Sequence, residues 1–305
     1  MTEKASVVPR GGAGRGVGDD ATAGCVAGGV RADGWVTAAV SARRARRFGA
    51  LYMASYLIRN MRRYGVVLVA YSVGQPLIYL VAMGLGLGTL VSGNSAALPG
   101  GVSYLVFLAP AILISTSVMV AATETTFPVM AGFKWQRTYY APHATALSSA
   151  QIAQGVMLAV CARVLFGSVV FWVFMQLFRT TDRMVESLLV IPISLLAALA
   201  FGLPVMAYAA SITEDRGQFA TVQRFIIMPL FLFSGTFYPL AVLPGYLQWI
   251  GWLSPIWHGT ELARVVSFSY AEPGWLTAVH VLFLVALALI GYLLSVRNFR
   301  KRLDA

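Results

Sequence analysis

The chain has 305 residues, of which 58% are hydrophobic and only 11% are Asp, Glu, Lys or Arg, yet its formal net charge is +11. Ordinary soluble domains carry about 25% charged residues, and a domain with so few could not cover its apolar surface without exposing large patches. The composition excludes a soluble enzyme, a disordered protein and a disulfide scaffold, and it predicts an integral membrane protein.

Nearly all of the excess positive charge lies at the two ends of the hydrophobic part of the chain. Seven arginines and no acidic residue fall between positions 41 and 65, and residues 297–304 carry a net charge of +3. Lys and Arg are enriched in the cytoplasmic segments of membrane proteins, so we expect both termini in the cytoplasm. The alternative is a nucleic-acid patch, but no predicted soluble domain would present one.

The N-terminal part contains no apolar segment long enough to cross a membrane. Residues 1–42 are rich in Gly, Ala and small polar residues and are predicted to form a disordered cytoplasmic tail. Residues 43–64 place a short apolar stretch between two arginine-rich ones, which is typical of an amphipathic helix lying in the membrane interface. Its lipid-facing side chains would be Phe48, Leu51, Tyr52 and Ile58.

Six hydrophobic stretches follow, and each is long enough to cross a hydrocarbon core of about 30 Å. They are Val66–Leu90, Tyr104–Thr123, Ala144–Phe178, Ser187–Thr213, Phe225–Thr260 and Pro273–Val296. We therefore predict an all-α integral membrane protein with six transmembrane helices over residues 65–302. The first external loop is uncharged, and the internal loops contain Lys134, Arg137, Arg216 and Arg224, as this orientation requires. The second external loop, between Phe178 and Ser187, is the exception, because it contains charges of both signs and is balanced.

The third stretch is too long for a single crossing and contains one ionised residue. Its 35 residues would extend about 50 Å as a helix, so its first part, from His143 to about Gln154, is predicted to project into the cytoplasm. Arg163 lies near its middle. An intramembrane charge is a candidate functional residue, and the alternative is an arginine whose side chain extends to the interface.

The fifth stretch contains four prolines, at positions 229, 239, 244 and 255, and cannot form one straight helix. We expect it to cross the membrane once and to end near Phe237, Tyr238 and Pro239. The remainder, LPGYLQWIGWLSPIWHG, carries three tryptophans, which favour the membrane interface. It is predicted to form short helices that re-enter the outer leaflet, and an ordinary external loop is the alternative.

The cytoplasmic loop between the second and third spans, TETTFPVMAGFKWQRTYYAPHA, is rich in aromatic and basic residues. Aromatic side chains at this position can anchor the chain at the lipid head groups. They can also dock a short helix into a soluble partner, because Trp, Tyr and Arg dominate binding energies at protein interfaces. The residues alone leave both interpretations open.

The sequence contains no combination of residues typical of an enzyme. His143, His258 and His280 are far apart in the chain and fall at different predicted depths, so no metal or catalytic site is predicted. The charged turn at residues 214–216 is predicted to be solvated.

Two stretches resemble the permease subunits of ABC-2-type exporters. FSGTFYPLAVLP, at Phe233–Pro244, is similar to the ending of that family's fifth span, and LSPIWHGTELAR, at Leu253–Arg264, is similar to its Pro-(x)-x-His-(small)-x-Glu-Leu-x-Arg stretch. The second stretch is closest to the lipo-oligosaccharide and nodulation-factor exporters, with the drug exporters next. The resemblance covers about residues 45–302 and leaves the tail outside.

The resemblance implies a permease that works with separate subunits. Two copies of an ABC ATPase would bind ATP and Mg, since this chain has no Walker A sequence and would hold no cofactor itself. A second permease, the same chain or a sister chain, would complete the pathway. The resemblance implies ATPase coupling through Glu124, Phe127, Pro128, Phe133, Lys134, Trp135, Arg137, Tyr139 and Tyr140. It implies an outer gate formed by Phe237, Tyr238, Pro239, Pro244, Trp249, Trp252, Pro255, His258 and Glu261.

These expectations describe a multi-pass protein of the bacterial cytoplasmic membrane that exports a lipid, glycolipid or amphipathic drug and binds no nucleic acid. The alternative from a different class is a secondary transporter or channel not driven by ATP. Such proteins usually show internal repeats with interrupted helices at matching positions, and this sequence has only one interrupted stretch. A third alternative, a lipid-modifying membrane enzyme, would need paired acids or histidines at one membrane face.

Overall fold

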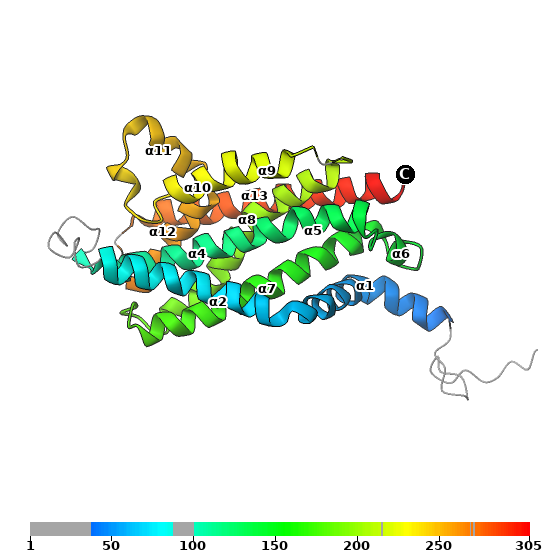
Figure 1. The fold of residues 1–305 in the computed structure, drawn as a ribbon, viewed down its shortest axis with the longest axis horizontal. Coiled ribbons are helices and arrows are strands. Elements are labelled where there is room, and N and C mark those ends of the chain that lie inside the picture. Colours follow the sequence, from blue (N-terminus) through cyan, green and yellow to red (C-terminus); the bar gives the residue numbers. More distant parts are fainter. Residues whose placement is uncertain (1–37, 88–100, 215, 269, 271) are drawn as a thin grey trace, which may run out of the picture. The chain divides into compact units, whose positions relative to one another are not determined.

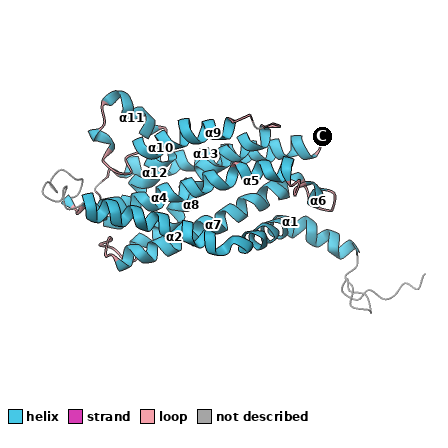
Figure 2. Ribbon diagram, viewed as in Figure 1, coloured by secondary structure: helices cyan, strands magenta, loops and turns pink. Residues whose placement is uncertain are grey.

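The computed structural model describes residues 38–87, 101–214, 216–268, 270 and 272–305. All regular structure in these residues is helical, which confirms the all-α prediction for them (Figure 2). The chain divides into two units, residues 1–44 and residues 45–305, and the packing described below is that of the second unit. Most of the predicted tail and of the first external loop lies outside the described residues.

The described residues contain twelve α-helices and six short 3-10 or π-helical turns. The helices are α1 (Ala38–Met61), α2 (Gly65–Val81), α4 (Tyr104–Thr125), α5 (Phe127–Met130), α6 (Tyr140–His143), α7 (Ser149–Leu177), α8 (Val190–Ser211), α9 (Gln218–Val222), α10 (Met228–Phe233), α11 (Gly245–Trp252), α12 (Pro255–Phe268) and α13 (Gly274–Leu303). The turns are Arg62–Tyr64, Ala82–Leu87, Ala131–Trp135, Glu186–Leu189, Gln223–Ile227 and Leu240–Val242.

Four helical segments among the described residues are long and apolar enough to cross a membrane. They are Tyr104–Trp135, Ser149–Leu177, Glu186–Ser211 and Gly274–Leu303, and they match the second, third, fourth and sixth predicted spans. The helical segment Gln218–Phe233 is apolar but shorter. Helix α2, in the first predicted span, is also short. The first and fifth predicted spans therefore do not correspond to helices that are long enough by themselves to cross a membrane.

Helix α8 lies at the centre of the bundle and packs against α13, α4, α12 and α7 (Figure 1). A Cβ atom added at Gly291 of α13 would lie 2.4 Å from Cδ of Pro204 on α8, so only glycine permits this approach. Small residues at such contacts are usual where helices pack in a membrane. The hydroxyls of Ser117, Ser168 and Ser194 form a buried hydrogen-bonded chain across α4, α7 and α8, with distances of 3.2 and 2.7 Å.

Helix α7 begins five residues after the start of its hydrophobic stretch. The Ser148 hydroxyl accepts a hydrogen bond from the Gln151 backbone N–H, and the Gln151 side chain accepts one from the Ser148 N–H. This capping box fixes the start of the helix, so the prediction of a continuous helix from His143 is wrong over residues 144–148. The 29 residues that remain still extend about 44 Å, which exceeds the thickness of a bilayer core.

Helix α1 begins at Ala38, five residues before the predicted start of the interfacial helix. Its Met53 side chain is buried, and a Cβ atom at Gly155 of α7 would lie 2.5 Å from Met53 Cβ. The Gln151 side chain also donates to the carbonyl oxygens of residues 45 and 46. These contacts attach one side of α1 to α7, while its other side exposes Phe48, Leu51, Tyr52 and Tyr56.

The four prolines divide the fifth hydrophobic stretch. Helix α10 ends at Phe233, and Gly235, with φ of 71°, turns the chain. Pro244 caps the start of α11 and Pro255 is the first residue of α12, a position where a missing N–H costs little. With 8 and 14 residues, α11 and α12 are both shorter than the roughly 20 residues that cross a bilayer.

Candidate functional site

The helical segment Tyr104–Trp135 breaks at Thr126, after α4, and continues as α5 and a π-helical turn (Figure 1). Helix α4 ends at Thr125, because Pro128 has no N–H to donate to the carbonyl of Glu124. Met130, in α5, and Phe133, in the π-helical turn after it, are buried. Both elements lie toward the end of the bundle where α13 ends (Figure 1).

A cluster of three aromatic rings attaches this segment to α13. The ring centroids of Phe133 and Tyr139 are 5.0 Å apart, and those of Phe133 and Phe299 are 4.8 Å apart. Aromatic pairs in this geometry contribute about 0.5–1.5 kcal/mol beyond the area they bury. Complete burial raises the pKa of the Tyr139 hydroxyl, so this group is neutral at physiological pH.

Gly132 lies directly under the Tyr139 ring, and a Cβ atom there would lie 2.3 Å from ring atom Cε2. The change Gly132→Ala should therefore displace Tyr139 and lower the free energy of unfolding by about 1–3 kcal/mol, the usual cost of overpacking. Denaturant-induced unfolding of the purified chain measures this change. Gly274→Ala is the matched control, because a Cβ atom there meets nothing within 4 Å; equal stabilities of the two variants would contradict the packing described.

The other side of the segment is exposed. Phe127 and Trp135 retain 45% and 55% of their accessible surface, and Lys134, Arg137 and Tyr140 are also exposed. Arg137 has φ of 51°, a left-handed conformation that is uncommon for residues other than glycine. The segment therefore presents an aromatic and basic surface outside the helix core.

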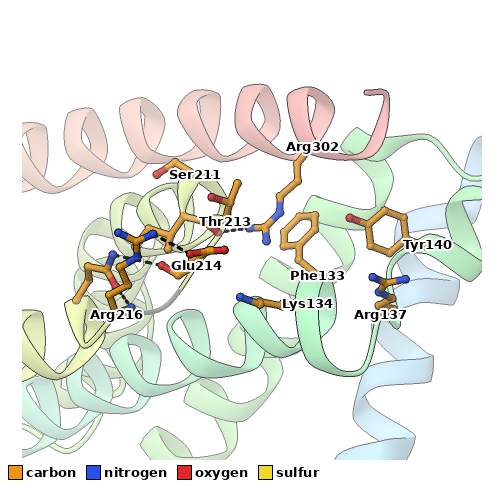
Figure 3. A pocket seen from close by; sticks show the side chains of 11 residues that line it. Phe133, Lys134, Arg137, Tyr140, Ser211, Thr213, Glu214, Arg216 and Arg302 are labelled. Atoms are coloured by element: carbon orange, nitrogen blue, oxygen red, sulfur yellow. Dashed lines mark hydrogen bonds and ion pairs between the residues drawn. The ribbon is translucent and has the colours of Figure 1, made fainter.

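A hollow of about 650 Å³ lies beside this surface (Figure 3). It is bounded by the exposed side of the segment, by the connection between α8 and α9 and by the end of α13. The charged side chains that line it are Lys134, Arg137, Arg216, Arg302 and Glu214. With four cations and one anion, this basic hollow is electrostatically suited to an acidic partner surface.

Arg302 holds together the three parts of the basic hollow. Its guanidinium donates to the carbonyl oxygens of Ala210 at 3.2 Å and Ile212 at 2.5 Å, and its Cζ lies 4.3 Å from the centroid of the Phe133 ring. Cation–π contacts of this kind stabilise the arrangement further. The sequence pattern identified Arg302 only as part of a basic flank. Glu214 and Arg216 are exposed and paired at 3.0 Å, in agreement with the predicted solvated turn.

Glu124 and Arg163 form an ion pair between α4 and α7, with side chains that are 10% and 15% exposed. The charge of Arg163 is thus compensated by a carboxylate from the last turn of α4. Of the nine residues for which the resemblance implies ATPase coupling, Glu124, Phe133 and Tyr139 are buried. The six that a partner could touch are Phe127, Pro128, Lys134, Trp135, Arg137 and Tyr140.

The residues for which the resemblance implies an outer gate lie at the opposite end of the bundle, around α11 and α12 (Figure 1). They divide into three groups by burial: Pro244, Trp249 and Trp252 are exposed, Phe237, Tyr238 and Pro239 are partly buried, and Pro255, His258 and Glu261 are buried. The tryptophans therefore face outward while the histidine and glutamate lie among the helices.

His258 and His280 are hydrogen bonded, so the prediction that the histidines lie apart is wrong for this pair. Their Nδ1 atoms are 2.6 Å apart, and Nε2 of His280 lies 2.9 Å from the Glu272 carboxylate. The different depths predicted for these two residues are therefore also wrong, because α12 packs against α13 and brings the two rings to the same level. The three groups form a chain, and within the described part of the molecule no three His, Cys, Asp or Glu side chains converge as metal ligands.

Arg264 is a second buried group that the sequence did not single out. It donates to Glu261 at 2.9 Å and to the carbonyl oxygen of Gly235 at 2.8 Å, and its Cζ lies 3.7 Å from the centroid of the Phe107 ring. Only 1% of its surface is exposed. Arg264 thus ties the turn after α10 to α12 and α4.

Comparison with known proteins gives consistent matches over most of the chain. The profile of the family described as ABC-2 type transporter matches residues 47–268. Nodulation protein J of Rhizobium leguminosarum bv. trifolii is 33% identical over 234 residues, which cover 75% of this chain and 84% of the relative. Nodulation protein J of Rhizobium meliloti (strain 1021) is 28% identical over 255 residues, which cover 83% of this chain and 93% of the relative. Both motif stretches lie within the matched residues.

Proposed function

Because the chain belongs to the ABC-2 type transporter family, we propose that it is the membrane-spanning permease subunit of an ATP-driven exporter and works with separate ATPase subunits. The observation that carries this proposal is the basic hollow, where two connections between helices and the end of α13 form one exposed surface. ATP binding by two ATPase subunits would then favour one of two states of a permease pair, through contacts that differ between the states.

The basic hollow and the exposed side of residues 127–140 would be the docking site for the ATPase. Trp, Tyr and Arg carry most of the energy at protein interfaces, and Trp135, Arg137 and Tyr140 supply these types on one exposed surface. The buried Phe133 and Tyr139 would position that surface by attaching it to α13. ATP and Mg would bind to the partner only.

The proposed topology has six spans in the bacterial cytoplasmic membrane, with both termini in the cytoplasm. Helix α2 with its π-helical extension would be the first span, and residues 218–233 would be the fifth. Helices α11 and α12 would re-enter the outer leaflet, where the exposed Trp249 and Trp252 suit the membrane interface.

Cysteine labelling tests this orientation. After replacement of Cys25 and Cys161, a cysteine at Val185, which is 85% exposed, should react with a membrane-impermeant maleimide in intact cells. A cysteine at Arg216, whose side chain is 79% exposed, should react only after the membrane is opened. The reverse pattern would contradict the topology and would place the basic hollow outside the cell.

The proposed cargo is a lipid, glycolipid or amphipathic drug, and the proposed pathway lies between this chain and a second permease, which is a copy of it or a sister chain. The apolar helices and the resemblance to lipo-oligosaccharide exporters support this cargo class. In proteoliposomes that contain the ATPase, addition of the chain should raise the rate of ATP hydrolysis. An unchanged rate, together with transport that a protonophore abolishes, would instead identify a secondary transporter.

A further inference from the structure

Arg163 lies between two hollows inside the helix bundle. One hollow, of about 440 Å³, is lined by Tyr56, Tyr64, Trp135 and Glu124 among others. The second, of about 400 Å³, is enclosed by α2, α4, α7 and α10, and Arg163 lines both. The Arg163 guanidinium therefore lies at the boundary between the first hollow, which has polar and aromatic walls, and the second, which is mainly apolar.

The hydrogen-bonding capacity of Arg163 is only partly used. One terminal nitrogen pairs with Glu124, whereas Nε is buried and has no hydrogen-bond partner. A guanidinium carries five N–H donors, and a buried donor without a partner costs free energy. The guanidinium thus has hydrogen-bonding capacity beyond its pairing with Glu124, and an anionic group that binds it would compete with that carboxylate.

The second hollow is suited to a hydrocarbon chain. Among the residues that the structure describes, Arg163 is the only charged one that lines it. Its far end is bounded by the aromatic rings of Tyr79 and Phe231, whose centroids are 6.2 Å apart. Along α4 it extends from Leu113 to Thr123, about 15 Å at 1.5 Å per residue. It is therefore an elongated, mainly apolar space with one cation at one end and the hydroxyls of Thr116, Ser117, Thr123 and Ser168 along its wall.

We infer that Arg163 and the second hollow bind an anionic amphiphile, with its phosphate or carboxylate on the guanidinium and its hydrocarbon chain between α4, α7 and α10. Arginine suits this role because its planar fork matches such oxyanions. Glu124 competes with the ligand for the same cation, so this carboxylate sets the affinity of the site. The ligand can be a resident membrane lipid or the exported cargo, which share this chemistry.

The test compares two probes that share a chain and a glycerol but differ in one phosphate: oleoyl-lysophosphatidic acid and monooleoylglycerol. Native mass spectrometry of the purified full chain in a neutral detergent measures their binding. The phosphate-bearing probe should bind at least about tenfold more tightly, the ratio expected for one charge-assisted contact. Equal binding of the two probes would overturn the inference.

The Glu124→Gln variant gives the sharpest result, because the inference predicts a gain. Removal of the competing carboxylate should strengthen binding of oleoyl-lysophosphatidic acid by about tenfold. The double variant Glu124→Gln with Arg163→Gln removes both charges and therefore leaves no unpaired buried charge. It should bind oleoyl-lysophosphatidic acid without that gain and should no longer prefer it over monooleoylglycerol. If Arg163 were only structural, Glu124→Gln would not increase binding, and that outcome would also overturn the inference.

Two further arms complete the experiment. Arg183→Gln, which breaks the exposed ion pair with Glu186, should leave the binding of both probes unchanged. In proteoliposomes with the ATPase, a cargo should raise ATP hydrolysis through Arg163, whereas a resident lipid should not. This last measurement rests on the proposed function, whereas binding to the purified chain does not. If the binding site is wrong, the purified chain does not prefer the phosphate-bearing probe; if only the proposed function is wrong, that preference remains and ATP hydrolysis does not change.

Discussion

Replacement of Arg264 by Ala should lower the free energy of unfolding by about 3–5 kcal/mol, the cost of removing one partner of a buried ion pair. The change leaves the buried Glu261 carboxylate without its cation and the Gly235 carbonyl without its donor. It also empties the space over the Phe107 ring. Unfolding of the purified chain in mixed micelles, with increasing denaturing detergent, measures the difference from the unchanged chain.

Arg183→Ala is the matched control for this prediction. Arg183 and Glu186 have the same three-residue separation as Glu261 and Arg264, but their side chains are about half exposed. Exposed pairs contribute about 0–1 kcal/mol, so this variant should remain close to the unchanged chain. The double variant Arg264→Met with Glu261→Gln should recover much of the lost stability, because it removes both buried charges. Equal stability of Arg264→Ala and Arg183→Ala would contradict the claim that the buried Arg264–Glu261 pair is needed for stability.

The double variant Trp135→Ala with Arg137→Ala should abolish most of the stimulation of ATP hydrolysis while the chain stays folded and in the membrane. Both side chains are exposed, so their loss should cost little folding stability. Interface residues of these types contribute about 2 kcal/mol or more each, which corresponds to a loss of affinity for the ATPase of about 30-fold per residue. Titration of the ATPase into proteoliposomes measures the concentration that gives half of the maximal rate.

Trp275→Ala with Arg179→Ala controls for the loss of exposed tryptophan and arginine as such. Trp275 is 68% exposed, and Arg179 has φ of 51°, the same backbone conformation as Arg137. These residues lie away from the basic hollow, and the titration curve should not change. Equal effects of the two double variants would show that the exposed side of residues 127–140 has no special part in coupling.

Hydrophobicity and prolines predicted where the helices lie. Four of the six stretches correspond to helices long enough to cross a membrane. Pro239, Pro244 and Pro255 lie at the starts of three short elements, which are the turn Leu240–Val242, α11 and α12. These features depend on local chain properties: an apolar run must be helical in a bilayer, and proline cannot continue a helix. The start of α7 was mispredicted because the Ser148 cap, also a local feature, was not recognised.

Contacts between distant residues were not predictable in the same way. Arg163 was identified as an unusual intramembrane charge, but its partner Glu124 lies 39 positions earlier, within a segment interpreted as a cytoplasmic loop. His258 and His280 meet because α12 packs against α13. Arg302 joins the basic hollow only through the fold. Hydropathy predicts which segments are helical. Contacts between residues that are distant in the chain depend on how the helices pack, which one sequence does not reveal.

Photo-crosslinking in intact cells tests most directly whether the basic hollow and the exposed side of residues 127–140 dock an ATPase. A photoreactive phenylalanine analogue is placed at Trp135, at Arg216 or at Val185, and the crosslinked products are identified by mass spectrometry. We predict that positions 135 and 216 both yield an adduct with a protein that contains a Walker A sequence, and that position 185 yields none with it. Absence of that adduct from both 135 and 216, or its formation from 185, would contradict the proposed docking face.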